Sequence, residues 1–341
     1  MYASIPDLLR LLAVPALGWA AVRDWKTRRV PNDLWSPLAF LGFALLFWEG
    51  LVSLGQPGAF QLYAVRVAFS VLFVVPLAYG FWYVGGFGGA DARAFMVLAV
   101  LLPTYPYYEV AGYALPQIHT AVGIFSLTVL TNTVLLGLAY PLVLGARNAL
   151  AGEFSYVMFV GRRVRVPELA TTHGSLLEDG DGFTRNGLDL DALRMYLRWR
   201  NTSLPELREN PGLRDPDTLP DSPGEPTDGA VIRDDTLTPS GGEPTTDGGH
   251  SVTDDASIDT DPGNVDADDP WGAAAFLGDI DGTAYGTTPA KLREGLDAVT
   301  EREDVWVTPG VPFLVPLFVG LLVSLTVGDV LYYALDAVGF A

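Results

Sequence analysis

The feature that most constrains this chain is a series of long apolar segments with almost no charged residues. A helix needs about 20 mostly apolar residues to cross the hydrocarbon core of a membrane. Six segments meet that description: 5–22, 35–54, 62–84, 92–108, 120–144 and 311–338. A count of five or seven stays open, because Pro103 and Pro106 interrupt the fourth segment. We therefore expect about six transmembrane helices.

Charge is distributed unevenly along the chain. The formal net charge of the 341 residues is −19, and residues 168–304 alone hold 31 acidic and 10 basic side chains. The remaining residues are mostly apolar, so the chain divides into a hydrophobic part and an acidic, water-facing part. These patterns predict an all-α membrane protein with a long, acidic and largely disordered cytoplasmic insertion before the last helix.

The insertion is not uniform. Residues 201–270 are rich in Asp, Pro, Gly, Ser and Thr, and such a composition predicts disorder because too little apolar surface can be buried. The apolar spacing from Asp189 to Arg200 predicts a short amphipathic helix, and Thr288 followed by Pro289 predicts another helix start. Its acidity is typical of a protein surface in a high-salt, halophilic cytoplasm, and a recruiting surface for basic partners is the alternative.

We accordingly predict five parts of the chain. They are a membrane domain with about five helices (1–145), a basic-to-amphipathic cytoplasmic segment (146–200), the acidic disordered insertion (201–270), a short ordered cytoplasmic segment (271–309) and the last transmembrane helix (310–341).

Lysine and arginine in the short flanking loops predict the orientation. Four basic residues lie in the loop 23–34, Arg93 lies near the loop 85–91, and four arginines lie in 147–165, whereas 55–61 and 109–119 contain none. Because basic loops stay on the cytoplasmic side, we expect 23–34, 85–91 and 146–309 in the cytoplasm and both termini outside. The chain is then a multi-pass protein of the cell membrane, in contact with lipid.

Two aspartates at the ends of apolar segments are the strongest candidates for chemistry. Asp24 follows the first segment and Asp91 precedes the fourth, and ionisable residues at such positions are costly and mark function. Two membrane crossings separate them, so both lie on the cytoplasmic face. Two adjacent carboxylates cannot both ionise and therefore retain one proton. The ionised carboxylate can draw a proton from an attacking water while its partner protonates the leaving amine, which is aspartic proteolysis.

Other interpretations of the two aspartates stay open. Asp24 can pair with Arg28 one helical turn later, and Asp91 can cap the helix that it opens. An ion- or proton-coupled transporter or channel that uses both aspartates as ion sites is the main alternative, and it predicts carboxylates near the membrane midplane. A membrane scaffold without catalysis is a third possibility.

Small residues precede Asp91 and are expected to shape the loop around it: Gly86, Gly88, Gly89 and Ala90. Glycine lets a backbone approach a substrate strand closely and adopt positive φ. The chain has no cysteine and only three histidines, which do not cluster. Thiolate metal sites and disulfides are therefore excluded, and we expect no metal, no cofactor and no nucleic-acid partner.

Two segments resemble known motifs. The segment from Asp24 to Asn32, which ends in Arg-Val-Pro-Asn, resembles the Asp…Arg-x-Pro-Asn segment of type IV prepilin peptidases. The segment from Gly88 to Arg93 is similar to the Gly-x-Gly-Asp-x-Lys motif of that family, and 306–313 resembles the start of the last helix in its archaeal members, the preflagellin peptidases. Ala90 and Arg93 depart from the motif, which has glycine and lysine there.

The resemblance implies an activity. In that family the residues that match Asp24 and Asp91 are the catalytic aspartates, and no cofactor takes part. The substrates implied are pilin-like and archaellin precursors, whose short basic leader is removed at the cytoplasmic membrane face. Many bacterial members also carry a paired-cysteine zinc loop and an N-methyltransferase activity. Without cysteine, this chain resembles the peptidase-only archaeal type.

Overall fold

The computed structural model describes residues 2–84, 87–179, 182–184, 187–231, 269–280, 284–309 and 312–339. These residues form two compact units. The first, here called the membrane unit, comprises Met1–Pro141 and Val311–Ala341. The second, the inserted unit, comprises Leu142–Gly310 and therefore interrupts the first along the chain.

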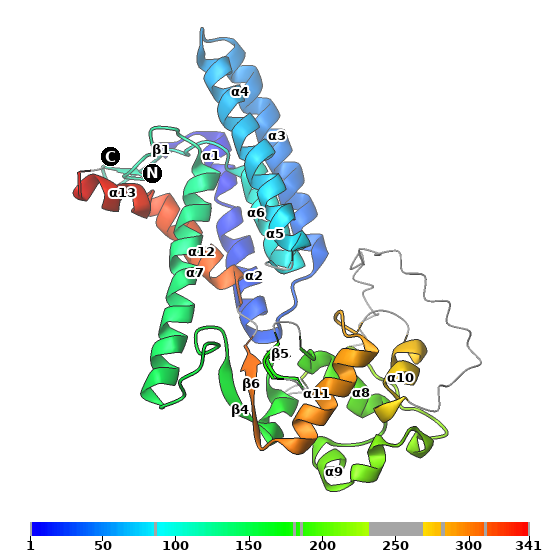
Figure 1. The fold of residues 1–341 in the computed structure, drawn as a ribbon. Helices are drawn as coiled ribbons and strands as arrows, with labels where there is room; N and C mark the ends of the chain where they lie inside the picture. Colours follow the sequence, from blue (N-terminus) through cyan, green and yellow to red (C-terminus); the bar gives the residue numbers. More distant parts are fainter. Residues whose placement is uncertain are drawn as a thin grey trace. The chain divides into compact units, whose positions relative to one another are not determined.

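Four helices are long and apolar enough to cross a membrane: Ile5–Thr27, Asn32–Leu54, Ala59–Tyr83 and Phe125–Leu150. Each of them consists of one or more shorter elements, and Figure 1 labels the α-helices among these. The parts are α1 (Ile5–Arg10) and α2 (Ala13–Thr27); η1 (Asn32–Leu34) and α3 (Trp35–Leu54); α4 (Ala59–Phe69), the π-helical η2 (Ser70–Val74) and α5 (Val75–Tyr83); and α7 (Phe125–Leu150). They correspond to the first, second, third and fifth segments expected from the sequence.

The fourth and sixth expected segments form shorter helices. The fourth gives α6 (Gly89–Leu101), which ends before Pro103 because the residue preceding a proline is driven out of the helical region. The last segment gives α12 (Leu314–Thr326) and α13 (Val330–Ala337). Gly328 separates these two helices with a φ of 100°, a conformation that favours glycine.

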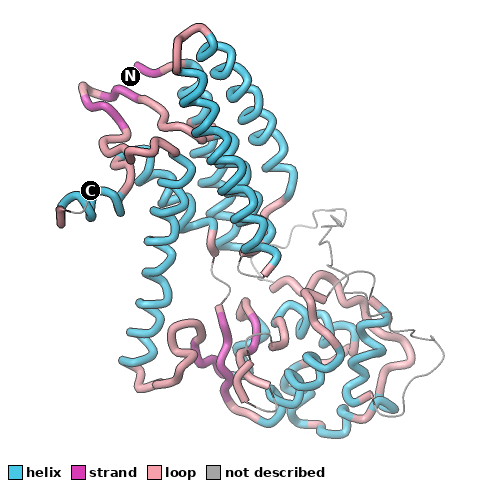
Figure 2. The backbone as a smooth tube through the Cα atoms, turned by 45° about the horizontal axis from the view of Figure 1, so that its top comes forward, coloured by secondary structure: helices cyan, strands magenta, loops and turns pink. Residues whose placement is uncertain are grey.

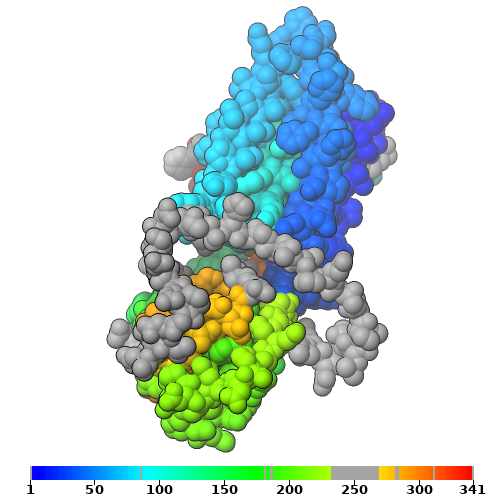
Figure 3. Space-filling model, turned by 90° about the vertical axis from the view of Figure 1, so that its right-hand side faces the viewer, coloured from blue at the N-terminus to red at the C-terminus, as the bar shows by residue number. Residues whose placement is uncertain are grey.

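The surface of the α3–α4 hairpin is apolar. The two helices pack side by side, and Figure 3 shows them in blue and light blue. Phe40, Phe47 and Leu72 are each at least 70% exposed, on α3 and the continuation of α4. Large exposed apolar faces are unusual on a protein surrounded by water, whereas lipid accommodates them without cost. This surface is what the apolar composition of a membrane helix predicts.

Helix α6 lies inside the membrane unit. It packs against α3 and α5, and eight of its side chains are buried, among them Phe95 and Leu101. Gly42 of α3 permits the close approach, because a Cβ there would lie 3.1 Å from the Leu101 nitrogen. Because α6 is apolar on all sides and enclosed by neighbouring helices, this packing fixes its position along the helix axis and its rotation. The first residues of α6 are therefore held in place as well.

A buried ion cluster anchors the other end of α6. The guanidinium of Arg10 is 1% exposed and pairs with Glu49 at 2.6 Å and with Asp7 at 3.0 Å. Its Nε also donates to the backbone carbonyl of Leu101, the last residue of α6, at 2.9 Å. Because each buried charge has partners, this cluster ties α1, α3 and α6 together.

Short β-sheets complete each unit, as the magenta segments in Figure 2 show. The membrane unit has an antiparallel sheet in the order β1 (Tyr2–Ala3), β2 (Tyr108–Val110), β3 (Tyr113–Leu115). The inserted unit has another in the order β4 (Arg162–Arg165), β6 (Asp304–Thr308), β5 (Ser175–Leu176). The chain is mostly helical, as expected, and the two short sheets are the part of the fold that the expectation of an all-α protein did not include. The strands are too short to show a two-residue period.

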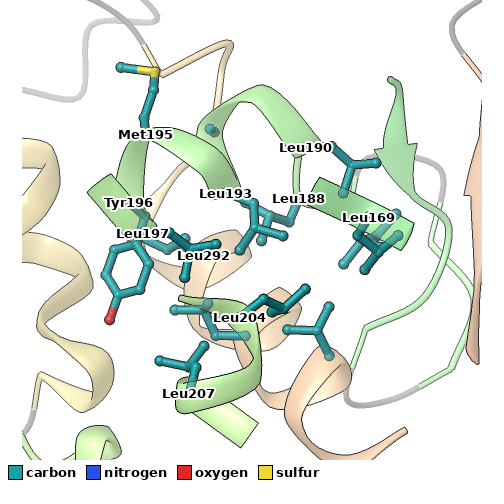
Figure 4. Packing of buried hydrophobic residues seen from close by; sticks show 14 of the residues in the cluster. Leu169, Leu188, Leu190, Leu193, Met195, Tyr196, Leu197, Leu204, Leu207 and Leu292 are labelled. Atoms are coloured by element: carbon teal, nitrogen blue, oxygen red, sulfur yellow. The ribbon is translucent and has the colours of Figure 1, made fainter. Parts of the chain in front are cut away.

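The inserted unit has a hydrophobic core of its own. Helices α8 (Leu190–Trp199), α9 (Leu204–Glu209), α10 (Ala273–Asp279) and α11 (Pro289–Glu301) contribute to it. In the close view of Figure 4, Leu193, Tyr196 and Leu292 lie among its packed side chains. The amphipathic helix expected between Asp189 and Arg200 is confirmed, as is the helix start at Thr288.

Part of the stretch that was expected to be disordered is ordered. Residues 201–231 contain α9 and the 3-10 turns η4 (Pro211–Arg214) and η5 (Pro216–Thr218). Two buried arginines of α8 fix this part: Arg194 donates to the carbonyl of Gly229, and Arg200 donates to the carbonyl of Leu213, both at 2.6 Å. Composition could not reveal these long-range bonds. Residues 232–268, the rest of that stretch, lie outside the described residues.

Asp189 caps α8 and allows a test of this unit. Its Oδ1 accepts the backbone N–H of Asp191 at 2.8 Å, so Asp189→Ala should lower the free energy of unfolding by about 1 kcal/mol. Hydrogen exchange of the α8 amides in the full chain would report the loss. Asp189→Asn, which keeps an oxygen acceptor, is the matched control and should lose less.

The difference in stability between Asp189→Asn and the wild type should depend on pH. Burial raises the pKa of the Asp189 carboxyl above its ordinary value, so the folded chain holds this proton more tightly than the unfolded chain does. Ionisation of Asp189 therefore destabilises the unit as pH rises from the unfolded to the folded pKa. Asn cannot ionise, so the stability of Asp189→Asn relative to the wild type should increase with pH. A constant difference would contradict this.

Candidate active site

Asp24 lies in the last turn of α2 and is bonded to the start of another helix. Its Oδ2 accepts the backbone N–H of Leu314, the first residue of α12, at 3.4 Å. N–H groups at a helix start lack intrahelical partners and carry partial positive charge, so they favour a carboxylate. The packing of α2 on α12 fixes this position, since a Cβ on Gly18 would lie 3.1 Å from the ring of Phe318.

Asp91 is the third residue of α6, and its side chain folds back onto the residue before the helix. Its Oδ2 accepts the backbone N–H of Gly88 at 3.1 Å. A Cβ at Gly88 would lie 2.9 Å from that oxygen, a separation that real Cβ contacts do not show. Gly88 has an ordinary φ of −66°, so glycine serves here to leave space rather than to permit positive φ as expected from the sequence.

The structure brings the two aspartates together. Their carboxylates interact electrostatically, and both side chains are half-buried. Two like charges at close range disfavour a doubly ionised pair, so one shared proton is the natural state of such a site. The argument from two membrane crossings led to the same juxtaposition.

The other small residues before Asp91 differ in their surroundings. Gly89 opens α6, and a Cβ there would meet only Trp82 Nε1 at 3.8 Å and Arg93 Nη1 at 3.9 Å. Ala90 is the second helical residue and packs, partly buried, against the core of the membrane unit. Alanine suits a helical position, so its departure from the glycine of the motif does not strain this backbone. Gly86 lies outside the described residues.

Arg93 links the two motif segments. Its guanidinium donates from Nη1 to the side-chain carbonyl oxygen of Asn32. Asn32 opens η1 after α2, whereas Arg93 lies in α6, so the bond joins the segment that follows Asp24 to the helix that carries Asp91. A guanidinium presents donors in a fixed planar geometry, which makes this a more directional link than an ammonium group.

Arg28 is the most unusual residue near the carboxylates. It caps the C-terminal end of α2 with a φ of 57°, and its charge interacts with that of the Asp24 carboxylate. Its Nε and Nη1 atoms are buried, yet neither has a hydrogen-bond partner among the described residues. Buried donors without partners are costly, and their persistence marks a place where a ligand or water can bind.

An aromatic cluster that sequence reasoning missed holds the glycine loop. The ring of Phe87 lies 5.0 Å from the ring of Phe81, 5.5 Å from Phe95 and 5.0 Å from Phe313, measured between centroids. These rings come from α5, α6 and the residue just before α12. Phe87 and Phe313 each adjoin a motif segment, and that proximity was the one available indication. Aromatic contacts of this kind add to the stability from burial alone.

The site therefore combines two carboxylates, backbone N–H donors and a guanidinium with buried donors. Such an arrangement can activate a water molecule and stabilise charge on a carbonyl oxygen. Within the ranges that the structure describes, no three histidine, aspartate or glutamate side chains gather where they could hold a metal ion.

Two segments of the chain match the models of known protein families. Residues 11–142 match the model of the type IV leader peptidase family. Residues 263–330 match the model described as the archaeal peptidase A24 C-terminus, type II. Together the two matches span more than half of the chain. A search of curated proteins found no match. The peptidase family favours proteolysis over the transporter alternative.

The steric role of Gly88 can be tested by comparing an alanine substitution at Gly88 with one at Gly89. Gly88→Ala places a methyl group against Asp91 Oδ2, so the carboxylate must move and cleavage of a leader-bearing precursor should fall by about tenfold or more. Gly89→Ala introduces the same methyl group where only ordinary contacts exist and should change cleavage much less. Initial rates on a gel, with membrane levels of each variant matched by immunoblot, provide the measurement. Equal activity of the two variants would contradict the steric role of Gly88.

Proposed function

We propose that this chain, which belongs to the type IV leader peptidase family, removes the leader peptides of pilin-like and archaellin precursors with Asp24 and Asp91 as its catalytic pair. The family is one of membrane-bound aspartic prepilin peptidases. The observation that carries the proposal is that these two carboxylates, which come from separate motif segments, lie close enough to interact electrostatically and are each held by a backbone N–H. The match to an archaeal C-terminal model supports archaeal substrates.

In the proposed reaction the two carboxylates share one proton. The ionised carboxylate draws a proton from a water molecule as the water attacks the scissile carbonyl, and the protonated carboxyl donates a hydrogen bond to the carbonyl oxygen. The tetrahedral intermediate then collapses, and a proton passes to the leaving amine. The backbone N–H of Leu314 donates to Oδ2 of Asp24, and the backbone N–H of Gly88 donates to Oδ2 of Asp91, so one oxygen of each carboxylate is held in place. Because helix starts fix both carboxylates, little reorganisation is needed in the transition state.

Arg28 is suited to a supporting role in this reaction. Its buried Nε and Nη1 donors lie beside Asp24, where a peptide carbonyl of the bound leader would approach. A hydrogen bond from the guanidinium would orient that carbonyl and satisfy donors that otherwise lack partners.

The reaction takes place at the cytoplasmic membrane face in this proposal. Asp24 ends one candidate membrane helix, and the basic residues that follow it favour the cytoplasm. A precursor would keep its basic leader at that interface while its apolar helix enters the bilayer. The scissile bond between them then lies at the depth of the two carboxylates.

The catalytic pair is tested by removing one charge at a time. Asp24→Asn and Asp91→Asn should each lower leader removal by roughly a hundred- to ten-thousand-fold, because the pair needs one ionised and one protonated carboxyl. The assay follows the shift of a pilin-like precursor on a gel in membranes that contain the full chain. Asp336→Asn, the same change on the exposed surface of α13, is the matched control and should leave processing unchanged. Processing that survives either catalytic substitution would refute the pair.

Arg28 provides a second test. Arg28→Gly removes the guanidinium but suits the positive φ at the end of α2, so the helix end should persist. Cleavage should fall by about tenfold or more in kcat/KM, and Arg28→Lys should recover only part of the loss because an ammonium cannot reproduce the planar donors. Full activity of Arg28→Gly would show that the guanidinium does not contact the substrate.

A further inference from the structure

The membrane unit contains an apolar cavity whose lining includes residues close in sequence to the site. Its volume is about 490 Å³. It lies between α5, α6, α7 and the start of α12, and its wall is formed by apolar and aromatic side chains and one glycine. The lining residues that matter here are Ala78, Phe87, Phe95, Val134, Gly137 and Phe313. A cavity of this size holds several apolar groups of a ligand, so it is more than a packing defect.

Three phenylalanines that line the cavity are close in sequence to residues of the site. Phe87 precedes Gly88, whose N–H binds Asp91, and Phe313 precedes Leu314, whose N–H binds Asp24. Phe95 lies one helical turn after Asp91 on α6, which places both on the same side of that helix. The lining of the cavity therefore includes residues that adjoin those holding both carboxylates.

The residues that line the cavity differ in exposure to solvent. Ala78 is 2% and Phe95 is 1% exposed, so both are buried. Leu138 is 54% and Phe81 is 45% exposed, and both lie on helices that can cross a membrane. The lining thus includes exposed apolar side chains on helices long and apolar enough to cross a membrane, which suits an apolar segment that lies in the bilayer.

We propose that this cavity binds the apolar side chains that follow the scissile bond of the precursor. The inference rests on the proposed function, which requires the leader on one side of the bond and an apolar helix on the other. No charged side chain lines the cavity among the described residues, so it cannot recognise the basic leader. Burial of an apolar side chain next to the carboxylates stabilises the bound segment and fixes the bond between them.

Gly137 of α7 allows the cavity to be filled. A Cβ at this position would meet only the Phe313 ring at 3.8 Å, an ordinary contact, so Gly137→Leu extends into the cavity without a backbone clash. Gly80 of α5 is the matched control, since nothing lies within 4 Å of a Cβ there and it does not line the cavity. Both changes add the same side chain to a glycine in a membrane helix.

The experiment compares precursors that differ only in the first residue after the scissile bond, which is Phe, Leu or Ala. For Gly137→Leu in the full chain, kcat/KM for the Phe precursor relative to the Ala precursor should fall by about tenfold or more, as expected when a pocket is filled. Gly80→Leu should keep the wild-type ratio. An unchanged ratio in Gly137→Leu would overturn the assignment. If the wild type cleaves none of the precursors, the proposed function fails instead.

A second measurement decides the case in which Gly137→Leu cleaves nothing. A precursor with photo-leucine at the first position after the bond is mixed with the full-length Asp91→Asn chain, illuminated and digested. Crosslinks to Val134 or Phe313 would support the assignment. Crosslinks confined to lipid or to the α3–α4 surface would overturn it and leave an acyl chain as the occupant of the cavity.

Discussion

The hydrogen bond between the Asp24 carboxylate and the Leu314 backbone connects the first membrane helix to the last across 290 residues of sequence. A carboxylate at the edge of a membrane needs a donor that water cannot reliably supply, and the start of α12 provides one. The same junction places Phe313 in the wall of the apolar cavity. Both the electrostatics of the site and the shape of its surroundings thus depend on the packing of α2 against α12.

The charged residues at the two ends of α6 have different surroundings. At one end of α6, Arg10 is surrounded by Glu49, Asp7 and a backbone carbonyl, so each group is paired and the cluster has a structural role. At the other end, Asp24 and Asp91 are like charges held close together, and Arg28 keeps buried donors without partners. Within the membrane unit, the ion pairs at one end of α6 thus contrast with the like charges and the buried Arg28 donors at the other end, a combination typical of functional sites.

Sequence patterns predicted the features that depend on local composition. The long apolar helices, the amphipathic helix between Asp189 and Arg200, the helix start at Thr288 and the placement of Asp24 and Asp91 on one face follow from residue spacing and the number of crossings. Features that depend on distant contacts were missed, because no local pattern encodes them. Leu314 as the donor to Asp24 is one, and the ordering of 201–231 by Arg194 and Arg200 is another. Gly88 was expected to shape the loop around Asp91 through close approach or positive φ, and in the structure it leaves space for the Asp91 carboxylate at an ordinary φ.

The inserted unit also determines when the site can form during biosynthesis. Both carboxylates are translated early, yet the helix that supplies the Leu314 donor leaves the ribosome only after the whole of Leu142–Gly310 has been made. A nascent chain therefore carries both aspartates for most of its synthesis without a completed site. The order of elements along the chain therefore delays completion of this pair of helix contacts until the inserted unit has been made.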